Sequence, residues 1–447
     1  MKTNLILFVV VFTSIATFSQ KQWTLKEAVN QALDKNISIQ QNKLSLELAK
    51  KDVDIAKGNF LPNLSGNTGG NLNFGTSFDP TTQNRTSTTL FGGSVNLSSN
   101  YTVFNGFRNT NTYKQAQLGV ESGLYDLKQI ENDISLRVVN TYLNILFAKE
   151  NLAVANVQAA ISKKQIEAAE ARFEAGAIAK GELLNFQSTA ANDLQNVIIQ
   201  ENALDLAVLN LAQLLQEPAE SFDVAPIEVG TPSASLLYQN SSAVYQKSLN
   251  YMPEIARAKL DIENADLNIA ITKGSFFPTI TASAGLSTNY GFDLKDNTIT
   301  TFSSLNKPLF SQFNENLGYG VGFNVSIPIF NRFQTKNRVA QSMINKEISE
   351  TRLESEKLQL KQTIEQAFLD VRSALKSYEA AKISLEAQKE AFKNAQERYN
   401  YGAMTLFDFD LVRTRLVNAE GIMIRSKYDY VFKTKVLQFY SGELVFD

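Results

Sequence analysis

The sequence predicts a mainly helical protein with a smaller β portion, in which a pair of strands and a long coiled-coil helix occur twice. Three observations support this fold class. A strand pattern runs directly into a long heptad pattern between Leu317 and Asp410, the same arrangement occurs earlier in the chain, and four segments alternate polar with apolar residues. Short strands joined directly to such long helices are not typical of a compact soluble domain.

The stretch from Leu317 to Asp410 begins as a strand, since apolar residues occupy every second position. These residues are Val321, Phe323, Val325, Ile327 and Ile329. An apolar or aromatic residue then recurs at every seventh position, with alanine frequent three residues later. The first set is Ile364, Val371, Tyr378, Leu385, Phe392 and Tyr399; the second includes Ala367, Ala374, Ala381 and Ala395. Because residues 334–401 contain neither Pro nor Gly, we expect one helix of about 100 Å.

The first half of the chain repeats these features. The segment Arg172-Phe-Glu-Ala-Gly-Ala resembles Arg398-Tyr-Asn-Tyr-Gly-Ala, and Gly58-Asn-Phe-Leu-Pro resembles Gly274-Ser-Phe-Phe-Pro. A period this long indicates a structural duplication and not a solenoid repeat. We therefore expect a first repeat over residues 20–230 and a second over 231–447, each with helices, two strands and a long helical hairpin. The strands are expected within about 62–104 and 278–330.

Composition limits the possible functions. Residues 1–19 have the features of a secretory signal peptide, with Lys2, an apolar run from Leu5 to Val11 and small residues before Gln20. The chain has no Cys and no His, so thiol catalysis, thiolate metal sites and the usual general base are excluded. A formal net charge of −2, evenly spread, gives no indication of nucleic acid binding. We expect no enzyme activity, no cofactor and no metal.

The remaining elements follow in order. Residues 23–34 predict a short amphipathic helix in which Thr24 and Glu27 form a capping box. The first half then predicts a helix at 37–58, a strand after Pro62, a polar loop at 75–90, a strand at 95–103, helices at 108–175 and 182–215, and a short strand at 223–229. The second half predicts a helix at 252–273, a strand after Pro278, a polar loop at 290–316, the stretch described above, and a helix at 406–440.

The four strands could form an ordinary small sheet packed on helices or part of a transmembrane barrel. Two features favour a barrel: each strand is about the ~9–11 residues needed to cross a bilayer, and the polar positions carry Ser, Asn, Gly and Thr, which suit a wet lumen. Four strands cannot close alone, because the smallest barrels have ~8, and an open edge is not tolerated in lipid. Two copies would give eight strands and three would give twelve. The helices could likewise form a solid bundle or a hollow tube continuing the barrel.

Several motifs together resemble the TolC family of bacterial outer membrane efflux proteins. They are the Trp-Thr-Leu-Lys-Glu-Ala-Val opening at Trp23, the paired Gly-x-Phe-x-Pro segments at Gly58 and Gly274, the paired strand ends at Val103 and Ile329, and the paired Arg-aromatic-x-x-Gly turns at Arg172 and Arg398. The resemblance implies a homotrimer in outer membrane lipid, with a twelve-stranded transmembrane β-barrel continuous with a periplasmic α-helical barrel. It also implies the exit duct of a tripartite efflux or type I export system, joined to an inner-membrane pump by a periplasmic adaptor (membrane fusion) protein.

The resemblance also places a periplasmic gate at the helix turns farthest from the membrane, residues 173–184 and 399–411. The implied gate residues are Tyr399, Asp408, Asp410 and Glu182. Three copies of each carboxylate would form an acidic ring that favours cations. The chain departs from the family pattern, with Met404 in place of a gate arginine and Leu411 in place of a second gate aspartate. Alternatively, Asp408 and Glu182 are first-turn acids favoured by the helix dipole.

The same turns are expected to contact the adaptor. Gly176 and Gly402 are placed to adopt a conformation closed to other residues, and Arg172 and Arg398 precede them. A polypeptide secretion duct is a variant of this interpretation, because substrate choice lies mostly with the pump. The alternative outside it is a structural or adhesive outer-membrane protein without a conduit, which longer surface loops would mark.

Overall fold

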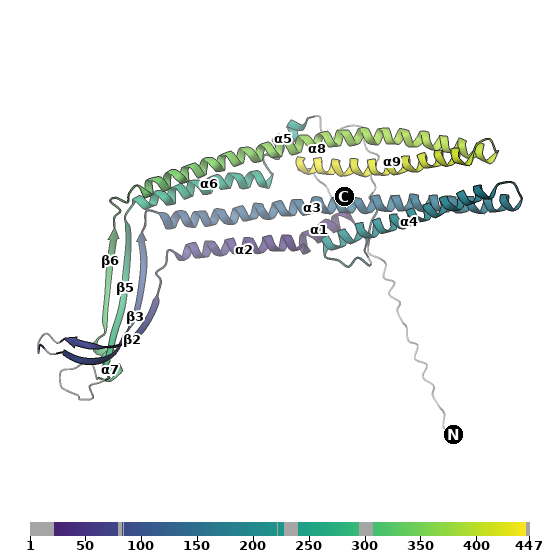
Figure 1. Cartoon of the computed structure of the whole chain (residues 1–447). Helices are drawn as coiled ribbons and strands as arrows, with labels where there is room; N and C mark the ends of the chain where they lie inside the picture. Colours follow the sequence, from purple (N-terminus) through teal and green to yellow (C-terminus); the bar gives the residue numbers. More distant parts are fainter. Residues whose placement is uncertain are drawn as a thin grey trace, which may run out of the picture. The chain divides into compact units, whose positions relative to one another are not determined.

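The computed structural model describes residues 22–78, 83, 85–220, 222–227, 240–294 and 307–443; the predicted signal peptide at 1–19 lies outside this part of the chain. The elements in order (Figure 1) are β1 (Gln22–Trp23), α1 (Leu25–Lys35), α2 (Ile37–Gly58), β2 (Ser65–Phe78), β3 (Arg85–Phe104), α3 (Arg108–Glu174), α4 (Lys180–Leu215), β4 (Asp223–Val224), α5 (Ser241–Ser248), α6 (Pro253–Lys273), η1 (Gly274–Phe276), β5 (Thr279–Asp293), α7 (Leu309–Glu315), β6 (Gly318–Ser326), α8 (Gln334–Asn400) and α9 (Leu406–Ser441).

The chain divides into two compact units, each assembled from segments of both expected repeats. The first, here called the helical unit, comprises residues 1–43, 126–255 and 356–447. The second, the sheet unit, comprises residues 44–125 and 256–355. Segments that are distant in sequence therefore contact one another within each unit. Neither compact unit coincides with one of the two expected repeats.

The helical unit has a core around α1 and the middle of α3. The side chains of Val138, Tyr142 and Ile145 are fully buried there, against Trp23 and Val29. The predicted capping box at the start of α1 is confirmed: the Glu27 backbone N–H donates to Thr24 Oγ1 at 3.2 Å, and the Thr24 N–H donates to Glu27 Oε2 at 3.0 Å. This cap satisfies amide groups that the first turn leaves without helical partners.

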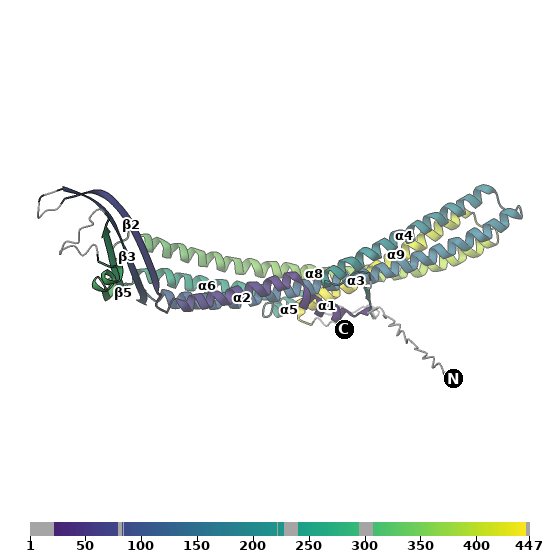
Figure 2. The ribbon, with the colours of Figure 1, turned by 90° about the horizontal axis from the view of Figure 1, so that it is seen from below.

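The predicted heptad seam of α8 is confirmed where it crosses the helical unit. Ile364, Val371 and Tyr378 are buried, and so are the alanines that follow each of them by three residues. The Tyr378 ring stacks on the ring of Tyr430 from α9, with centroids 6.5 Å apart. Alanine at one seam position lets neighbouring helices approach closely, which explains the paired helices seen in Figure 2.

The sheet unit contains a four-stranded antiparallel sheet in the order β2-β3-β5-β6. One row across all four strands is Gly66, Leu97, Leu286 and Tyr319. We call the end where the strands join α2, α3, α6 and α8 the near end, and the opposite end the far end. The strands β2 and β6 are the outer members of the sheet.

Two loop predictions are wrong. The polar loop expected at 75–90 is largely strand, because β2 continues to Phe78 and β3 starts at Arg85. The loop expected at 290–316 contains the end of β5 and the helix α7. Thr-rich segments lack an apolar alternation to detect, although threonine is a good strand former. The helix α5 was also not predicted.

Candidate functional site

The sheet has one apolar face and one polar face. The apolar face carries Phe91, Val95, Leu97, Tyr101, Leu286, Tyr290, Phe292, Tyr319, Val321, Phe323 and Val325, which the register places on the same side. Tyr319 and Val321 are each 85% exposed. A contiguous apolar surface of this kind marks contact with a membrane or another protein, so this face requires an apolar partner.

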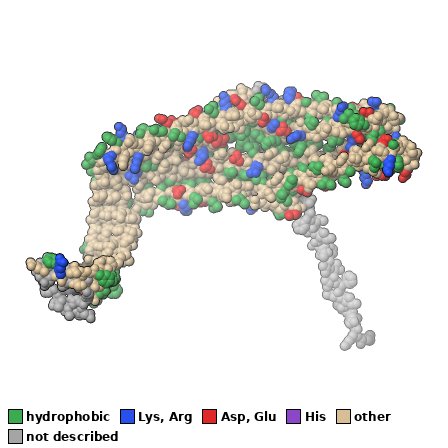
Figure 3. Space-filling model, in the orientation of Figure 1, with side chains coloured by type: hydrophobic (Ala, Val, Ile, Leu, Met, Phe, Trp, Pro, Cys, Tyr) green, Lys and Arg blue, Asp and Glu red, His purple; other side chains and the backbone are tan. Residues whose placement is uncertain are grey.

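The polar face is uncharged through the middle of the sheet. It carries Asn67, Asn71, Ser94, Asn96, Ser98, Asn100, Ser283, Ser287, Asn289 and Asn324. Within the four strands, the charged residues are Arg85 and Asp293, both at the far end. Figure 3 shows the middle of the visible face without the blue or red of charged groups. Small hydrated side chains opposite an apolar face are the pattern of a transmembrane barrel wall.

Aromatic rings gather at both ends of this sheet. At the far end, Tyr290 lies 5.9 Å from Phe91 and 5.7 Å from Phe313 between ring centroids. At the near end, the two strand-to-helix junctions carry the pairs Phe104–Phe107 and Phe330–Phe333, at 5.3 and 5.5 Å. Aromatic bands at both ends of an apolar wall are typical of the two interfaces of a membrane-spanning barrel.

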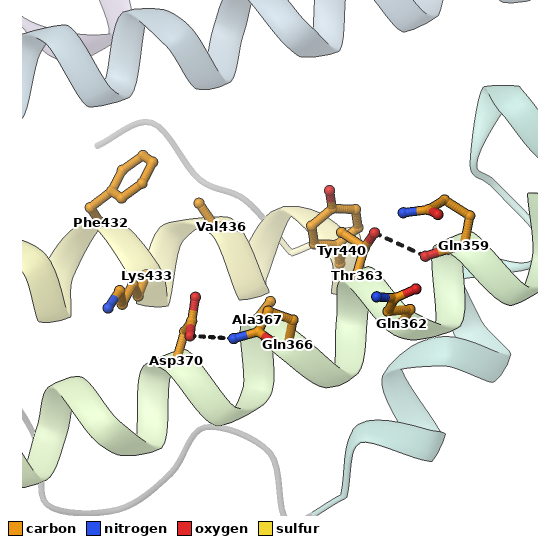
Figure 4. Close-up of a pocket in the computed structure, with 10 residues that line it drawn as sticks. All are labelled: Gln359, Gln362, Thr363, Gln366, Ala367, Asp370, Phe432, Lys433, Val436 and Tyr440. Carbon is orange, nitrogen blue, oxygen red and sulfur yellow. Dashed lines mark hydrogen bonds between the residues drawn. The ribbon is translucent and has the colours of Figure 1, made fainter.

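The described residues give less support to a membrane-spanning helix, a metal site or a ligand-binding groove. Within the described ranges, none of the helices has an apolar stretch long enough to cross a membrane. Among the same residues, His, Cys, Asp and Glu form no group of three or more that could hold a metal. A groove of about 380 Å³ lies between α8 and α9 (Figure 4), where Gln366 Nε2 donates to Asp370 Oδ1 at 2.8 Å. We assign no ligand to this groove, because its one carboxylate, Asp370, already accepts from Gln366.

The helical unit holds the second candidate site, at the turns of its two hairpins. The Tyr399 hydroxyl, at the end of α8, donates to Glu182 Oε1 at the start of α4, at 3.1 Å. The Arg172 guanidinium lies 5.8 Å from the centroid of the Tyr399 ring. Burial, followed by the hydrogen bond to Glu182, raises the pKa of Tyr399 to about 12, so the hydroxyl remains a donor. This bond joins the first turn to the second.

The Tyr399 ring is held in place by neighbouring aromatic side chains. It stacks on the buried Phe409 of α9 with centroids 5.1 Å apart, and meets Phe186 of α4 edge-on at 6.3 Å. Phe392 of α8 lies 5.6 Å from Phe409 between ring centroids. Packing by side chains from α4 and α9 therefore orients the ring whose hydroxyl binds Glu182.

The two turns use their first-turn acids differently. In the second turn, the Asp408 backbone N–H donates to Thr405 Oγ1, and the Thr405 hydroxyl donates to Asp408 Oδ2 at 2.7 Å. Asp408 is exposed but bound into this cap. In the first turn, Ala179 takes the place of Thr405 and provides no side-chain cap. Glu182, in the position that matches Asp408, is therefore free to accept from Tyr399.

Asp410 lies beside a buried arginine that sequence reasoning missed. Arg413 of α9 is 7% exposed, and its Nη1 lies 2.8 Å from Asp193 Oδ2 of α4. The Arg413 Nε lies 3.7 Å from Asp410 Oδ1. Burial raises the pKa of Asp410 and Asp193 raises it further, while Arg413 lowers it. The only sequence signal for this cluster is the three-residue spacing of Asp410 and Arg413; nothing local indicates Asp193.

The predicted turn glycines have the expected backbone. The φ angles of Gly176 and Gly402 are +70° and +72°, which residues with a Cβ rarely adopt. The Ala177 and Ala403 amides each donate to the carbonyl of the arginine five residues earlier, Arg172 and Arg398, at 2.8 Å. The Arg398 Nη2 also lies 3.4 Å from Ala403 O. Both turns are thus closed in the same way.

Very long helices, a two-faced sheet and an uncharged polar surface define a protein of the outer-membrane channel class. The model of the family described as outer membrane efflux protein matches residues 28–216 and 244–443. The chain is similar to the outer membrane efflux protein BepC of Brucella suis, with 23% identity over 98% of this chain and 88% of that protein. It is similar to the outer membrane protein TolC of Vibrio cholerae, with 22% identity over 99% of this chain and 96% of that protein.

The fold agrees with that of a solved channel. The open state of the Neisseria gonorrhoeae MtrE outer membrane channel matches with a TM-score of 0.70 and 18% identity, covering 95% of this chain and 90% of that one. This chain belongs to the outer membrane efflux protein family. It is a channel protein of the outer membrane serving efflux, not an enzyme, and the predicted family resemblance is confirmed.

Proposed function

We propose that three copies of the chain combine their sheets into one twelve-stranded barrel that continues into a periplasmic helical tube. The observation that carries this proposal is a four-stranded sheet with an exposed apolar face and, in the described part, outer strands β2 and β6 that pair on one side only. Four strands are too few to close, and open edges are not tolerated in lipid. Pairing of β2 with β6 of another copy satisfies both requirements.

In this assembly the polar face of the sheet lines the lumen and the apolar face meets lipid. An uncharged lumen wall gives little charge selectivity, so selectivity falls to the turns of the helical unit. Three copies of Glu182 and Asp408 around one axis form acidic rings that favour cations. The channel is passive, and its cargo is chosen by the pump.

The gate is held closed by the bond between Tyr399 and Glu182. This bond ties the end of α8 to the start of α4, so opening of the turns must break it or move both hairpins together. The turns at Gly176 and Gly402, with Arg172 and Arg398, form the surface that receives a periplasmic adaptor. The adaptor connects the channel to an inner-membrane pump, which makes the protein the exit duct of a tripartite system.

Conductance in planar bilayers tests the duct and its gate together. Tyr399→Phe removes only the hydroxyl, which is worth roughly 1 kcal/mol or about a fivefold change in the ratio of open to closed states. We expect small cation-preferring channels for the unmodified protein and larger or more frequent openings for Tyr399→Phe. Glu182→Gln keeps an acceptor for Tyr399 and removes the charge, so we expect it to reduce cation preference.

Tyr428→Phe is the matched control, because the Tyr428 hydroxyl donates to Glu150 Oε1 at 2.6 Å between α9 and α3, away from the turns. It should leave conductance unchanged. Stable insertion without conductance in any variant would refute the duct and favour a structural outer-membrane role. Equal conductance in Tyr399→Phe and the unmodified protein would place the gate elsewhere.

A further inference from the structure

The strand β5 extends beyond the end of its neighbour β6. The last paired row joins Ser287 of β5 to Gly318 of β6, whereas β5 continues to Asp293. On its other side, β5 remains paired with β3 up to Asp293 and Leu90. The far end of β5 therefore has backbone N–H and C=O groups that lie beyond the start of β6 and have no strand partner on that side. Such groups cost free energy in a membrane wall if they stay unpaired.

Side chains from α7 and the residue that follows it pair with two of these groups. The Gly291 backbone N–H donates to Gln312 Oε1 at 2.8 Å, and Asn316 Nδ2 donates to the Asn289 carbonyl at 2.8 Å. Gln312 is 3% exposed, and its Nε2 donates to the Lys307 carbonyl at 2.8 Å. Two amide side chains thus replace the hydrogen bonds that a longer β6 would have supplied.

The helix α7 packs on the apolar face of the sheet. The Phe313 ring lies 5.7 Å from the ring of Tyr290, and the Thr288 hydroxyl donates to the Phe313 carbonyl at 2.9 Å. Thr288 and Tyr290 are on the same side of β5 as Leu286. The Tyr290 hydroxyl would lie only 2.7 Å from a Cβ at Gly93, so the glycine leaves room for the tyrosine side chain.

One aromatic side chain of α7 is almost fully exposed. Phe310 is 83% exposed and lies 6.3 Å from Phe313 between ring centroids. The rings of Phe91, Tyr290, Phe313 and Phe310 therefore form one line from the sheet outwards. The neighbouring charges, Lys307 Nζ and Glu315 Oε2, neutralise each other at 2.6 Å. An exposed aromatic ring continuous with an apolar wall matches an interfacial anchor in lipid.

We propose that α7 completes the membrane wall beyond the end of β6 and inserts Phe310 among the acyl chains of the surrounding lipid. The proposal rests on the proposed function, since the apolar face of the sheet must face lipid. It assigns Gln312 and Asn316 the role of positioning residues that hold α7 on β5. The partner is lipid and not a second protein, because the anchor continues the surface that the barrel already presents to the membrane.

The single tryptophan of the chain, Trp23, permits a direct test. In a Trp23→Phe background, Phe310→Trp provides one fluorescent reporter in vesicles of phosphatidylcholine brominated on the acyl chains. We expect strong quenching and a blue-shifted emission. Val321→Trp on the apolar face of β6 and Tyr401→Trp, at a turn position that is 88% exposed, serve as lipid and water references.

The reference positions 321 and 401 distinguish the anchor proposal from the barrel proposal. Quenching at 310 and 321 but not at 401 supports the anchor. Quenching at 321 alone overturns the anchor and leaves the barrel intact. Quenching at neither 310 nor 321 overturns both, because the sheet would then not lie in lipid.

Hydrogen exchange tests the role of Gln312 independently of lipid. Gln312→Ala removes the acceptor for the Gly291 amide, and we expect that amide to exchange roughly tenfold faster. The Leu294 amide, which donates to the Thr89 carbonyl at 2.8 Å on the β3 side, is the internal control and should be unchanged. Equal rates at Gly291 in the variant and the unmodified protein would show that α7 does not protect this edge.

Discussion

At the residue scale, Asp410, one of the two aspartates predicted for the gate, has a charged partner within its own chain. Asp410 shares Arg413 with Asp193, so two carboxylates face one guanidinium. Asp408 is held by Thr405, and Glu182 by Tyr399. Each acid of the expected ring therefore has a distinct environment, although sequence position makes them look alike.

The raised pKa of Asp410 gives a pH-dependent prediction. Because the folded protein binds this proton more tightly than the unfolded chain, the ionised carboxylate opposes folding at neutral pH, and this penalty is relieved as the pH falls through the raised pKa. Asp410→Asn should therefore raise the thermal midpoint at neutral pH, with a gain that shrinks towards about pH 4. The control is Asp205→Asn at an exposed position on α4. A gain that grew at acid pH would contradict the assignment.

Alanine substitution should have opposite effects on stability at the turn glycine Gly402 and at the helical glycine Gly421. Gly402→Ala places a Cβ on a residue with φ of +72° and should cost about 1–2 kcal/mol. Gly421→Ala inside α9 should instead stabilise by roughly 1 kcal/mol, because alanine is the better helix former. Thermal unfolding followed by circular dichroism measures both. A stabilising effect of Gly402→Ala would mean that the backbone at Gly402 is not left-handed.

At the element scale, the Tyr142 hydroxyl connects both strands of the short sheet β1–β4 to α3. The Tyr142 hydroxyl lies 2.9 Å from the Trp23 carbonyl and 2.7 Å from the Ala225 carbonyl. Burial raises the pKa of Tyr142, so it remains a donor. Lys149 adds a contact from the next turns of α3 to Asp223. Three segments distant in sequence meet here.

Tyr142→Phe should destabilise the helical unit by roughly 1–3 kcal/mol, since it leaves the Ala225 carbonyl without its donor and removes one of the two donors to the Trp23 carbonyl. We also expect faster exchange of the Ala225 amide, which donates to the Trp23 carbonyl at 2.9 Å. Tyr125→Phe is the control, because the Tyr125 hydroxyl makes no hydrogen bond within the described part of the chain. If both variants unfold at the same temperature as the unmodified protein, the hydroxyl is not what fastens β1 and β4.

At the scale of the whole molecule, the absence of cysteine makes the proposed assembly easy to test. Gly322→Cys on β6 can be combined in turn with Ser65→Cys, Asn67→Cys, Gly69→Cys or Asn71→Cys on β2, all on the polar face. Oxidation in membranes should give a ladder that ends at three chains for one of these pairs. Gly322→Cys with Asn96→Cys on the central strand β3 is the negative control. A ladder that ended at two chains would indicate an eight-stranded barrel.

The sequence by itself determined the periodic features of this protein. Period-two alternation predicted the strands, heptads with alanine predicted the buried seam of α8, and paired motifs predicted the family. These are local or regularly spaced signals, and repeated positions such as Gly176 and Gly402 carry them directly. Where the alternation fades, as at the end of β2, at the Thr-rich start of β3 and in α7, prediction failed.

Only the tertiary structure decided which polar groups meet. The resemblance placed Tyr399 and Glu182 at the same gate, but no sequence pattern indicates their hydrogen bond. Likewise, nothing near Arg413 indicates Asp193, and nothing near Gly291 indicates Gln312. Each pairing depends on how helices and strands from distant parts of the chain pack. A hydrogen bond needs two groups within about 3 Å, and periodicity fixes which face a side chain occupies but not which partner stands opposite.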